Sequence, residues 1–133
     1  MGAVMNKPYI LCVDDDKTIL MSLRAQLKRG LGDQFAYEVA ESAREAWEVI
    51  NEFKESGISL SLIISDWMMP EIKGDEFLIQ VHSQYPEIPK MMLTGQADPE
   101  AIKRAQDFAN LACCLTKPWN RDSLIETIKA VIH

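Results

Sequence analysis

The chain has 133 residues, of which 47% are hydrophobic and 26% are charged, and its 20 acidic residues outnumber its 14 Lys and Arg residues. This length suits one domain with an ordinary hydrophobic core, and the composition is too apolar for a disordered chain. The net charge of −6 argues against broad binding to nucleic acid or to an anionic membrane. No apolar run approaches the ~20 residues that a membrane span needs, so we expect a soluble, cytoplasmic protein.

Five short apolar runs have the length of β-strands, and they cover 9–13, about 36–40, 61–65, 90–94 and 111–116. Most of them are continuously apolar, as expected of parallel strands that are covered on both faces. The second run is more mixed, which suits a strand at the edge of a sheet.

The segments between these runs carry apolar residues at helical spacing, within 20–31, 43–53, 77–81, 102–108 and 124–131. Ser42 with Glu45 predicts a capping box, and Asp98 before a proline predicts another helix start. Asp16 is expected to cap the first helix, and either Asn120 or Asp122 the last. This alternation predicts a doubly wound α/β domain, with a parallel sheet, right-handed crossovers and helices on both faces.

Polar side chains follow four of the five runs. Asp14 and Asp15 follow the first, Asp66 the third, Thr94 closes the fourth and Lys117 follows the fifth. Ligands of such sheets bind outside the carboxyl ends of the strands. Three converging carboxylates repel one another and need a cation, and a ligand set made only of oxygen favours Mg²⁺, with Mn²⁺ as a second candidate.

A carboxylate beside such a cation can attack a phosphoryl group and form an aspartyl phosphate. The charge on the transferred group then calls for positioned cations and hydrogen-bond donors. Lys117 can neutralise one phosphoryl oxygen, and the Thr94 hydroxyl or nearby backbone N–H groups can bind another.

Taken together, these motifs resemble the receiver domain of two-component response regulators. The resemblance is carried by Val13-Asp14-Asp15, by Asp66-Trp67-Met68-Met69-Pro70 with Gly74 following, by Thr94-Gly95 and by Lys117-Pro118-Trp119. It covers the chain from about Tyr9 to Ile132, so we expect an N-terminal extension over 1–8 and a receiver domain over 9–133. It implies a flavodoxin-like (βα)5 fold with a five-stranded parallel sheet in the order 2-1-3-4-5.

The resemblance also implies a role for each site residue. Asp66 would accept a phosphoryl group from a histidine kinase or a histidine phosphotransfer protein, and Asp14, Asp15, Asp66 and the backbone carbonyl of Met68 would hold Mg²⁺. Lys117 would contact the phosphoryl group, and Thr94 would move toward it. The bond between Lys117 and Pro118 would be cis. Such a domain catalyses only its own phosphorylation and dephosphorylation, switches the contacts of an output partner, and is not expected to bind nucleic acid or a membrane directly.

Other families fit the residues less well. The run Asp14-Asp15-Asp16-Lys17-Thr18 satisfies the DxDxT motif of haloacid-dehalogenase-like phosphatases, with Asp14 as nucleophile and Asp16 as general acid. However, the later acidic pair of those enzymes is missing, and Asp66 would have no role. A flavodoxin-like FMN binder is disfavoured because three aspartates would repel the FMN phosphate. A receiver-shaped module that no longer accepts phosphate gains little support, because the acceptor, the acidic pair, the threonine and the lysine are all present.

The chain departs from the family pattern at Cys114, because the family usually has Tyr, Phe or His three residues before the lysine. The usual coupling of the threonine to an aromatic ring is therefore in doubt. Met68 and Gln96 occupy positions that influence hydrolysis of the phosphoryl group in the family, and we expect Met68 to hinder entry of water. Trp67 should report ligands by its fluorescence. We expect free, buried thiols at Cys12, Cys113 and Cys114, and mainly packing roles for Met69, Met91, Met92 and Trp119.

Overall fold

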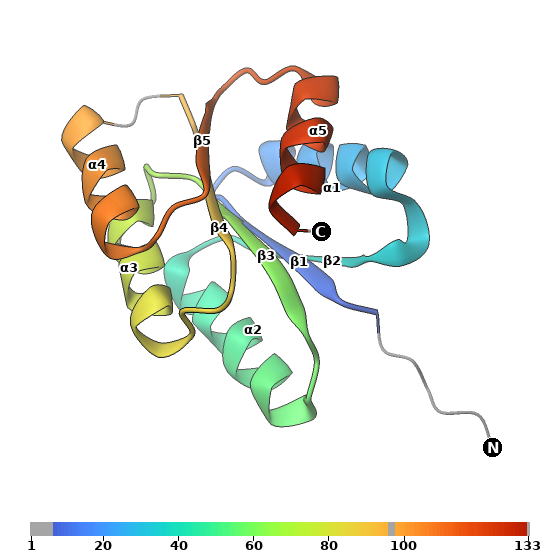
Figure 1. Ribbon diagram of the computed structural model, residues 1–133, viewed down its shortest axis with the longest axis horizontal. Coiled ribbons are helices and arrows are strands. Elements are labelled where there is room, and N and C mark those ends of the chain that lie inside the picture. The colour runs from blue at the N-terminus through green and yellow to red at the C-terminus, as the bar shows by residue number, and fades with distance from the viewer. Residues whose placement is uncertain (1–6, 96–97, 133) are drawn as a thin grey trace.

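The structure is a computed structural model that describes residues 7–95 and 98–132, and in this part of the chain five strands alternate with five α-helices (Figure 1). The strands are β1 (Tyr9–Val13), β2 (Ala36–Ala40), β3 (Leu60–Ser65), β4 (Lys90–Thr94) and β5 (Cys113–Thr116). The helices are α1 (Lys17–Leu31), α2 (Ala43–Ser56), α3 (Gly74–Gln84), α4 (Pro99–Phe108) and α5 (Arg121–Ile132), and a short 3-10 turn (Gly32–Gln34) follows α1.

The strands form one parallel sheet in the order β2-β1-β3-β4-β5, which confirms the predicted flavodoxin-like topology. The mixed strand β2 lies at an edge, as its sequence predicts. The order changes direction between β1 and β3, because β2 adds to one side of β1 and all later strands add to the other. Val13 of β1 pairs with Ser65 of β3. The chain segments that leave these two strands therefore emerge side by side at the point where ligands bind in this type of fold.

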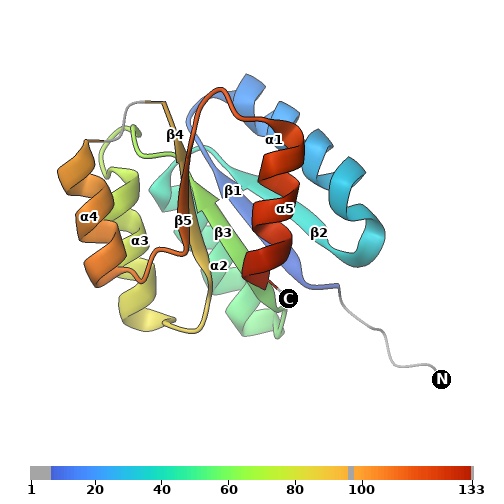
Figure 2. The same cartoon turned by 45° about the horizontal axis from the view of Figure 1, so that its top comes forward.

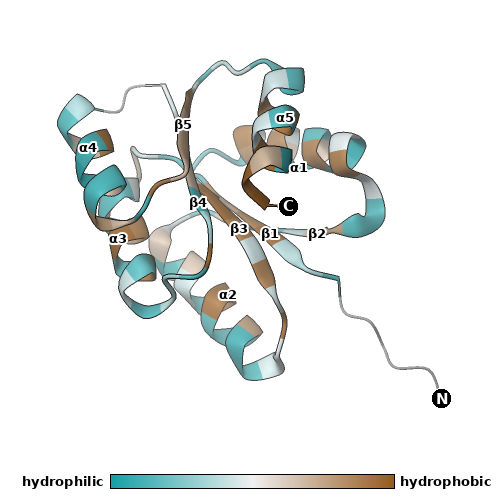
Figure 3. Cartoon of the chain, in the orientation of Figure 1, coloured by the Kyte–Doolittle hydropathy of each residue, from teal (hydrophilic) through white to brown (hydrophobic). Residues whose placement is uncertain are grey.

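Helices cover both faces of the sheet (Figure 2). Along β1, Leu11 and Val13 join a core formed with α2, α3 and α4, whereas Ile10 and Cys12 join a second core formed with α1 and α5. This alternation follows from the period of two along a strand. Apolar residues accordingly lie along the strands and on the inner faces of the helices, and polar residues lie on the outer faces of the helices (Figure 3).

The helix caps agree with the sequence patterns. Asp16, Asp98 and Asn120 each accept a hydrogen bond from a backbone N–H in the first turn of the following helix. The Ser42 hydroxyl accepts from the backbone N–H of Glu45 at 3.1 Å. The carboxylate of Glu45 accepts from Glu41 rather than from Ser42, so the return bond of the capping box lies one residue earlier than predicted.

The last strand was predicted too long, because β5 begins at Cys113 and not at Leu111. Asn110 adopts a left-handed conformation with φ 53°, and the N–H of Leu111 donates to the carbonyl of Ala105. These residues therefore end α4, and apolar Leu111 packs against the core without joining the sheet.

Most predictions about packing are confirmed. The side chains of Met69, Met91 and Met92 are buried in the two cores, and the cysteines are free. Cys12 is fully buried as expected, whereas Cys113 and Cys114 are only half-buried because β5 is the other edge strand. The bond between Lys117 and Pro118 is cis, as the resemblance implied. Within the described residues, no helix has the length and apolar character needed to cross a membrane.

Candidate functional site

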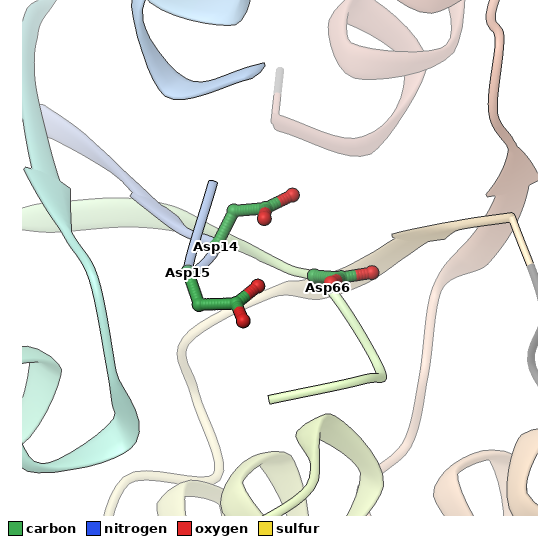
Figure 4. Close-up of side chains that lie close together, drawn as sticks. All are labelled: Asp14, Asp15 and Asp66. Atoms are coloured by element: carbon green, nitrogen blue, oxygen red, sulfur yellow. The ribbon is translucent and has the colours of Figure 1, made fainter. Parts of the chain in front are cut away.

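Three carboxylates meet at the carboxyl ends of β1 and β3. The backbone N–H of Asp66 donates to the carbonyl of Val13 at 2.8 Å, which fixes the segment after β3 beside the segment after β1. One carboxylate oxygen from each of Asp14, Asp15 and Asp66 lies within 4.8 Å of the others (Figure 4). The predicted convergence of these residues is therefore confirmed.

The cluster is suited to a divalent cation. Asp14 and Asp66 are only 4% and 7% exposed, whereas Asp15 is open to solvent. Burial raises the pKa of Asp14, although its hydrogen bonds with Lys117 and with the backbone of Asp16 oppose this shift. Carboxylates packed this closely are stabilised by a cation, and the all-oxygen donor set fits a hard ion of the Mg²⁺ type.

Lys117 reaches this cluster from the segment after β5. Its Nζ atom lies 2.6 Å from Asp14 Oδ2 and 3.3 Å from Asp66 Oδ1. Burial alone would lower the pKa of Lys117, but its hydrogen bonds and charge interactions with these two carboxylates outweigh burial and raise it. The ammonium group of Lys117 therefore bridges Asp14 and Asp66, and it is placed to pair with an anionic group bound beside Asp66.

Thr94 closes β4 at the same edge of the sheet. Thr94 is 3% exposed, and its backbone carbonyl accepts a hydrogen bond from the backbone N–H of Lys117 at 3.0 Å. This bond joins the segments that follow β4 and β5. The structure thus brings Thr94 to the neighbourhood of Lys117, while Gln96 lies outside the described residues.

The two residues after Asp66, Trp67 and Met68, have different surroundings. Met68, two residues after Asp66, is 46% exposed. The indole of Trp67 turns toward α3, where its Nε1–H donates to Asp75 Oδ1 at 3.0 Å, and the ammonium group of Lys73 lies over its ring. The role of the Met68 carbonyl as a metal ligand stays a prediction.

The sequence analysis assigned no role to two residues next to the site. Gly74 was noted only as part of a motif, yet a Cβ atom at this position would lie 2.0 Å from the carbonyl oxygen of Asp66. Asp75 was not singled out, because an acidic residue in the first turn of a helix is usually a solvated one that favours the helix dipole. In the structure Asp75 is only 4% exposed.

The phosphatase alternative is not favoured. Asp16, its general acid, is exposed, and one of its oxygens accepts from the backbone N–H groups of Thr18 and Ile19. Asp66, for which that alternative has no role, is instead a buried member of the cluster.

A family model described as response regulator receiver domain matches residues 10–129. Chemotaxis protein CheY1 of Helicobacter pylori is 30% identical over 125 residues, which cover 92% of this chain and 95% of that protein. Hydrogenase transcriptional regulatory protein HoxA of Cupriavidus necator is 31% identical over 124 residues. This match covers 93% of the chain but only 24% of the regulator, so the chain spans about a quarter of that relative.

Solved structures show the same likeness. A CheY-like response regulator receiver domain protein from Methanospirillum hungatei JF-1 superposes with a TM-score of 0.80 at 30% identity, over 94% of this chain and 93% of the other. The signal receiver domain of an HD domain-containing protein from Pseudomonas fluorescens Pf-5 gives a TM-score of 0.83 at 26% identity, over 95% and 94% of the two chains.

Proposed function

The chain belongs to the response regulator receiver domain family of two-component signalling, and on this premise we propose that Asp66 is the residue that accepts the phosphoryl group. One observation carries the proposal: the Asp66 carboxylate lies close to the carboxylates of Asp14 and Asp15 and 3.3 Å from the ammonium group of Lys117. Carboxylates that can hold a cation and a lysine that can pair with phosphoryl oxygens are thus gathered around one buried carboxylate.

In the proposed reaction, a carboxylate oxygen of Asp66 attacks the phosphorus atom of a phosphohistidine. A P–O bond forms as the P–N bond breaks, and the imidazole leaves with a proton taken from solvent. Lys117 balances charge on the equatorial oxygens, and the Thr94 hydroxyl donates to one of them. Asp66 returns to a free carboxylate when water attacks the acyl phosphate, so the domain acts on its own phosphoryl group and is not expected to turn over other substrates.

We propose that Asp14, Asp15, Asp66 and the Met68 carbonyl hold Mg²⁺, with Mn²⁺ as a substitute. When bound there, the ion would neutralise carboxylate charge and one phosphoryl oxygen. Lys117 Nζ lies 2.6 Å from Asp14 Oδ2, so we expect this ion pair to loosen when the Asp14 carboxylate binds the metal ion. The ammonium group then becomes available to the phosphoryl oxygens.

We further propose that a histidine kinase or a histidine phosphotransfer protein is the phosphodonor, and that the switch acts on an output partner by favouring one of two surface arrangements. The three free cysteines suit a reducing compartment, which supports action in the cytoplasm. We take the receiver to comprise residues 9–133, with 1–8 as an extension. Direct binding to nucleic acid or to a membrane is not part of the proposal.

The test is incubation of the chain with acetyl phosphate and Mg²⁺, followed by intact-mass measurement of the wild type and of Asp66→Asn. We expect the wild type to gain one phosphoryl group and the variant to gain none. Hydrolysis of phosphate esters that survives Asp66→Asn and is lost in Asp14→Asn would instead establish the phosphatase alternative. Omitting Mg²⁺ or adding a chelator should suppress the mass gain.

A further inference from the structure

A buried carboxylate outside the acidic cluster links the segment after Asp66 to α4. Asp75, in the first turn of α3, accepts from the indole of Trp67 at 3.0 Å through Oδ1. Its other oxygen, Oδ2, accepts from Nη1 of Arg104 on α4 at 2.9 Å. The Asp75 side chain is 6% exposed, so both bonds act on a group that is largely removed from water.

Arg104 holds two acidic residues of α3 at once. While Nη1 binds Asp75, Nη2 lies 3.3 Å from Glu76 Oε2. A guanidinium group suits this geometry, because its donors are fixed in a planar fork. The resulting contact joins the start of α3 to the second half of α4, and these two helices lie side by side in both ribbon views (Figures 1 and 2).

The start of α3 is in turn fixed to the acceptor segment. The backbone N–H of Gly74 donates to the carbonyl of Trp67 at 2.8 Å, and Gly74 lies so close to Asp66 that no side chain fits between them. Trp67 itself stands between Asp66 and Met68, the two residues of this segment that we propose as ligands. We therefore expect phosphorylation of Asp66 and binding of the metal ion to change the conformation of the segment that carries the Trp67 indole.

The aromatic readout that the family resemblance implies lacks its ring in this chain. β5 carries Cys114, which has no ring that could change rotamer when Thr94 moves. The hydrogen-bonded chain Trp67–Asp75–Arg104 does not pass through β5, and it ends on α4.

We propose that Trp67, Asp75 and Arg104 couple the state of Asp66 to the position of α4, with Asp75 and Arg104 as positioning residues. This inference rests on the proposed phosphorylation of Asp66 and names how that site is read out. Phosphorylation adds about −1.5 to −2 charges at the residue that precedes Trp67. The charge and the ligands drawn to it reorient the segment, the indole carries the change to Asp75, and Arg104 transmits it to α4.

The structure supplies a spectroscopic readout, because the indoles of Trp47, Trp67 and Trp119 donate to different partners, namely Gln80, Asp75 and Gln26. ¹H–¹⁵N spectra of the full chain therefore contain indole signals that Trp→Phe variants can assign. Beryllofluoride with Mg²⁺, a mimic of the phosphoryl group, is added as the probe. In the wild type we expect shifts of the Asp66 amide, of the Trp67 indole and of amides in α4 such as Ala101 and Ala105, with little change at the Trp47 indole.

Arg104→Gln tests the link. The shifts at Asp66 and at the Trp67 indole should persist, whereas the shifts of the α4 amides should fall to less than half of the wild-type size. Lys103→Gln is the matched control, because it removes the same charge from the same helix and its ion pair is with Asp107 within α4. It should keep the full response. Arg104→Lys retains one cationic donor and should restore part of the response.

Asp75→Asn provides a second break, because Trp67 and Arg104 donate to different oxygens of Asp75, and one of these positions becomes an NH2 group that cannot accept. It decides the matter if Arg104→Gln does not fold. A full α4 response in Arg104→Gln or Asp75→Asn would overturn the coupling, as would a silent Trp67 indole in a wild type whose Asp66 amide shifts. No change at Asp66 in the wild type would instead overturn the proposed phosphorylation, and the coupling with it.

Discussion

At the scale of single residues, Lys117 and the expected cation compete for the same oxygens. The ammonium group lies 2.6 Å from Asp14 and 3.3 Å from Asp66, in the region that a metal ion would share. Two cations in this space repel each other, so the lysine lowers the affinity of the empty site for Mg²⁺ while it favours the more anionic phosphorylated state.

Lys117→Met should therefore separate metal binding from phosphoryl transfer. We expect Mg²⁺ to bind about tenfold more tightly, or about 1.4 kcal/mol, because a competing positive charge is removed. Phosphoryl transfer from acetyl phosphate should become much slower. Mg²⁺ titration followed by tryptophan fluorescence gives the affinity, and the control is Lys103→Met, at a lysine of α4 whose ion pair is with Asp107. Weaker Mg²⁺ binding in Lys117→Met would contradict this account.

In our account Met68, which is 46% exposed and lies two residues after Asp66, hinders access of water to the phosphoryl group. Met68→Asn replaces an apolar group with one that can hydrogen-bond a water molecule. We expect several-fold faster loss of the phosphoryl group, measured as the decay of the phosphorylated mass after removal of the phosphodonor. An unchanged or slower decay would show that Met68 does not hinder water.

At the scale of elements, the join between β3 and α3 is the least tolerant part of the site. A Cβ atom at Gly74 would lie 2.0 Å from the carbonyl oxygen of Asp66 and 2.9 Å from the Cα atom of Trp67. Because these are backbone atoms, the clash cannot be relieved by rotation of a side chain.

Gly74→Ala should destabilise the fold by about 3 kcal/mol, at the upper end of ordinary overpacking. It should also displace Asp66 and weaken beryllofluoride binding. Urea denaturation measures the first effect. Gly95→Ala is the control for stability, because its Cβ atom would meet the nearest atom, Lys117 Cβ, at 3.7 Å, an ordinary contact. Equal stability of the two variants would refute the prediction.

The start of β4 holds a buried lysine at the end of the sheet opposite the site. Lys90 is 1% exposed, its Nζ donates to the carbonyl of Ile88, and Nδ1 of His82 lies 3.2 Å away. Burial lowers the pKa of Lys90 below its usual 10.5, although the charge of Glu87 opposes the shift. The unfolded chain thus binds this proton more tightly than the folded chain does.

It follows that Lys90 costs stability below its folded pKa, and that this cost disappears as the pH rises through the lowered value toward 10.5. Lys90→Met should therefore be more stable than the wild type at neutral pH, and the difference should shrink as the pH approaches 10.5. Thermal unfolding of both proteins across this range measures it. A difference that is independent of pH would mean that the charge of Lys90 is not what costs stability.

Most elements could be predicted from the sequence, because continuous apolar runs and helical stripes are local patterns. The clear error, the start of β5, arose at Leu111, where an apolar residue packs on the core without entering the sheet. Apolar character alone does not distinguish these two situations.

At the scale of the whole molecule, part of the acidity of the chain is concentrated in one cluster. Asp14, Asp15 and Asp66 could be predicted as a cluster, since a parallel sheet brings the carboxyl ends of its strands to one edge. The pairing of Asp75 with Arg104 could not be predicted, because it depends on how α3 packs beside α4 and the two residues lie 29 positions apart. Nothing in the local sequence distinguishes either residue from a solvated charge.

The central claim is that Asp66, and not Asp14, becomes the acyl phosphate. The most direct measurement treats the phosphorylated chain with borohydride, which reduces an aspartyl phosphate to homoserine, and locates that residue by peptide mass spectrometry. The account predicts homoserine at position 66 alone, dependent on Mg²⁺ and on the phosphodonor. Homoserine at position 14, or none in a chain that has gained phosphate, would contradict it.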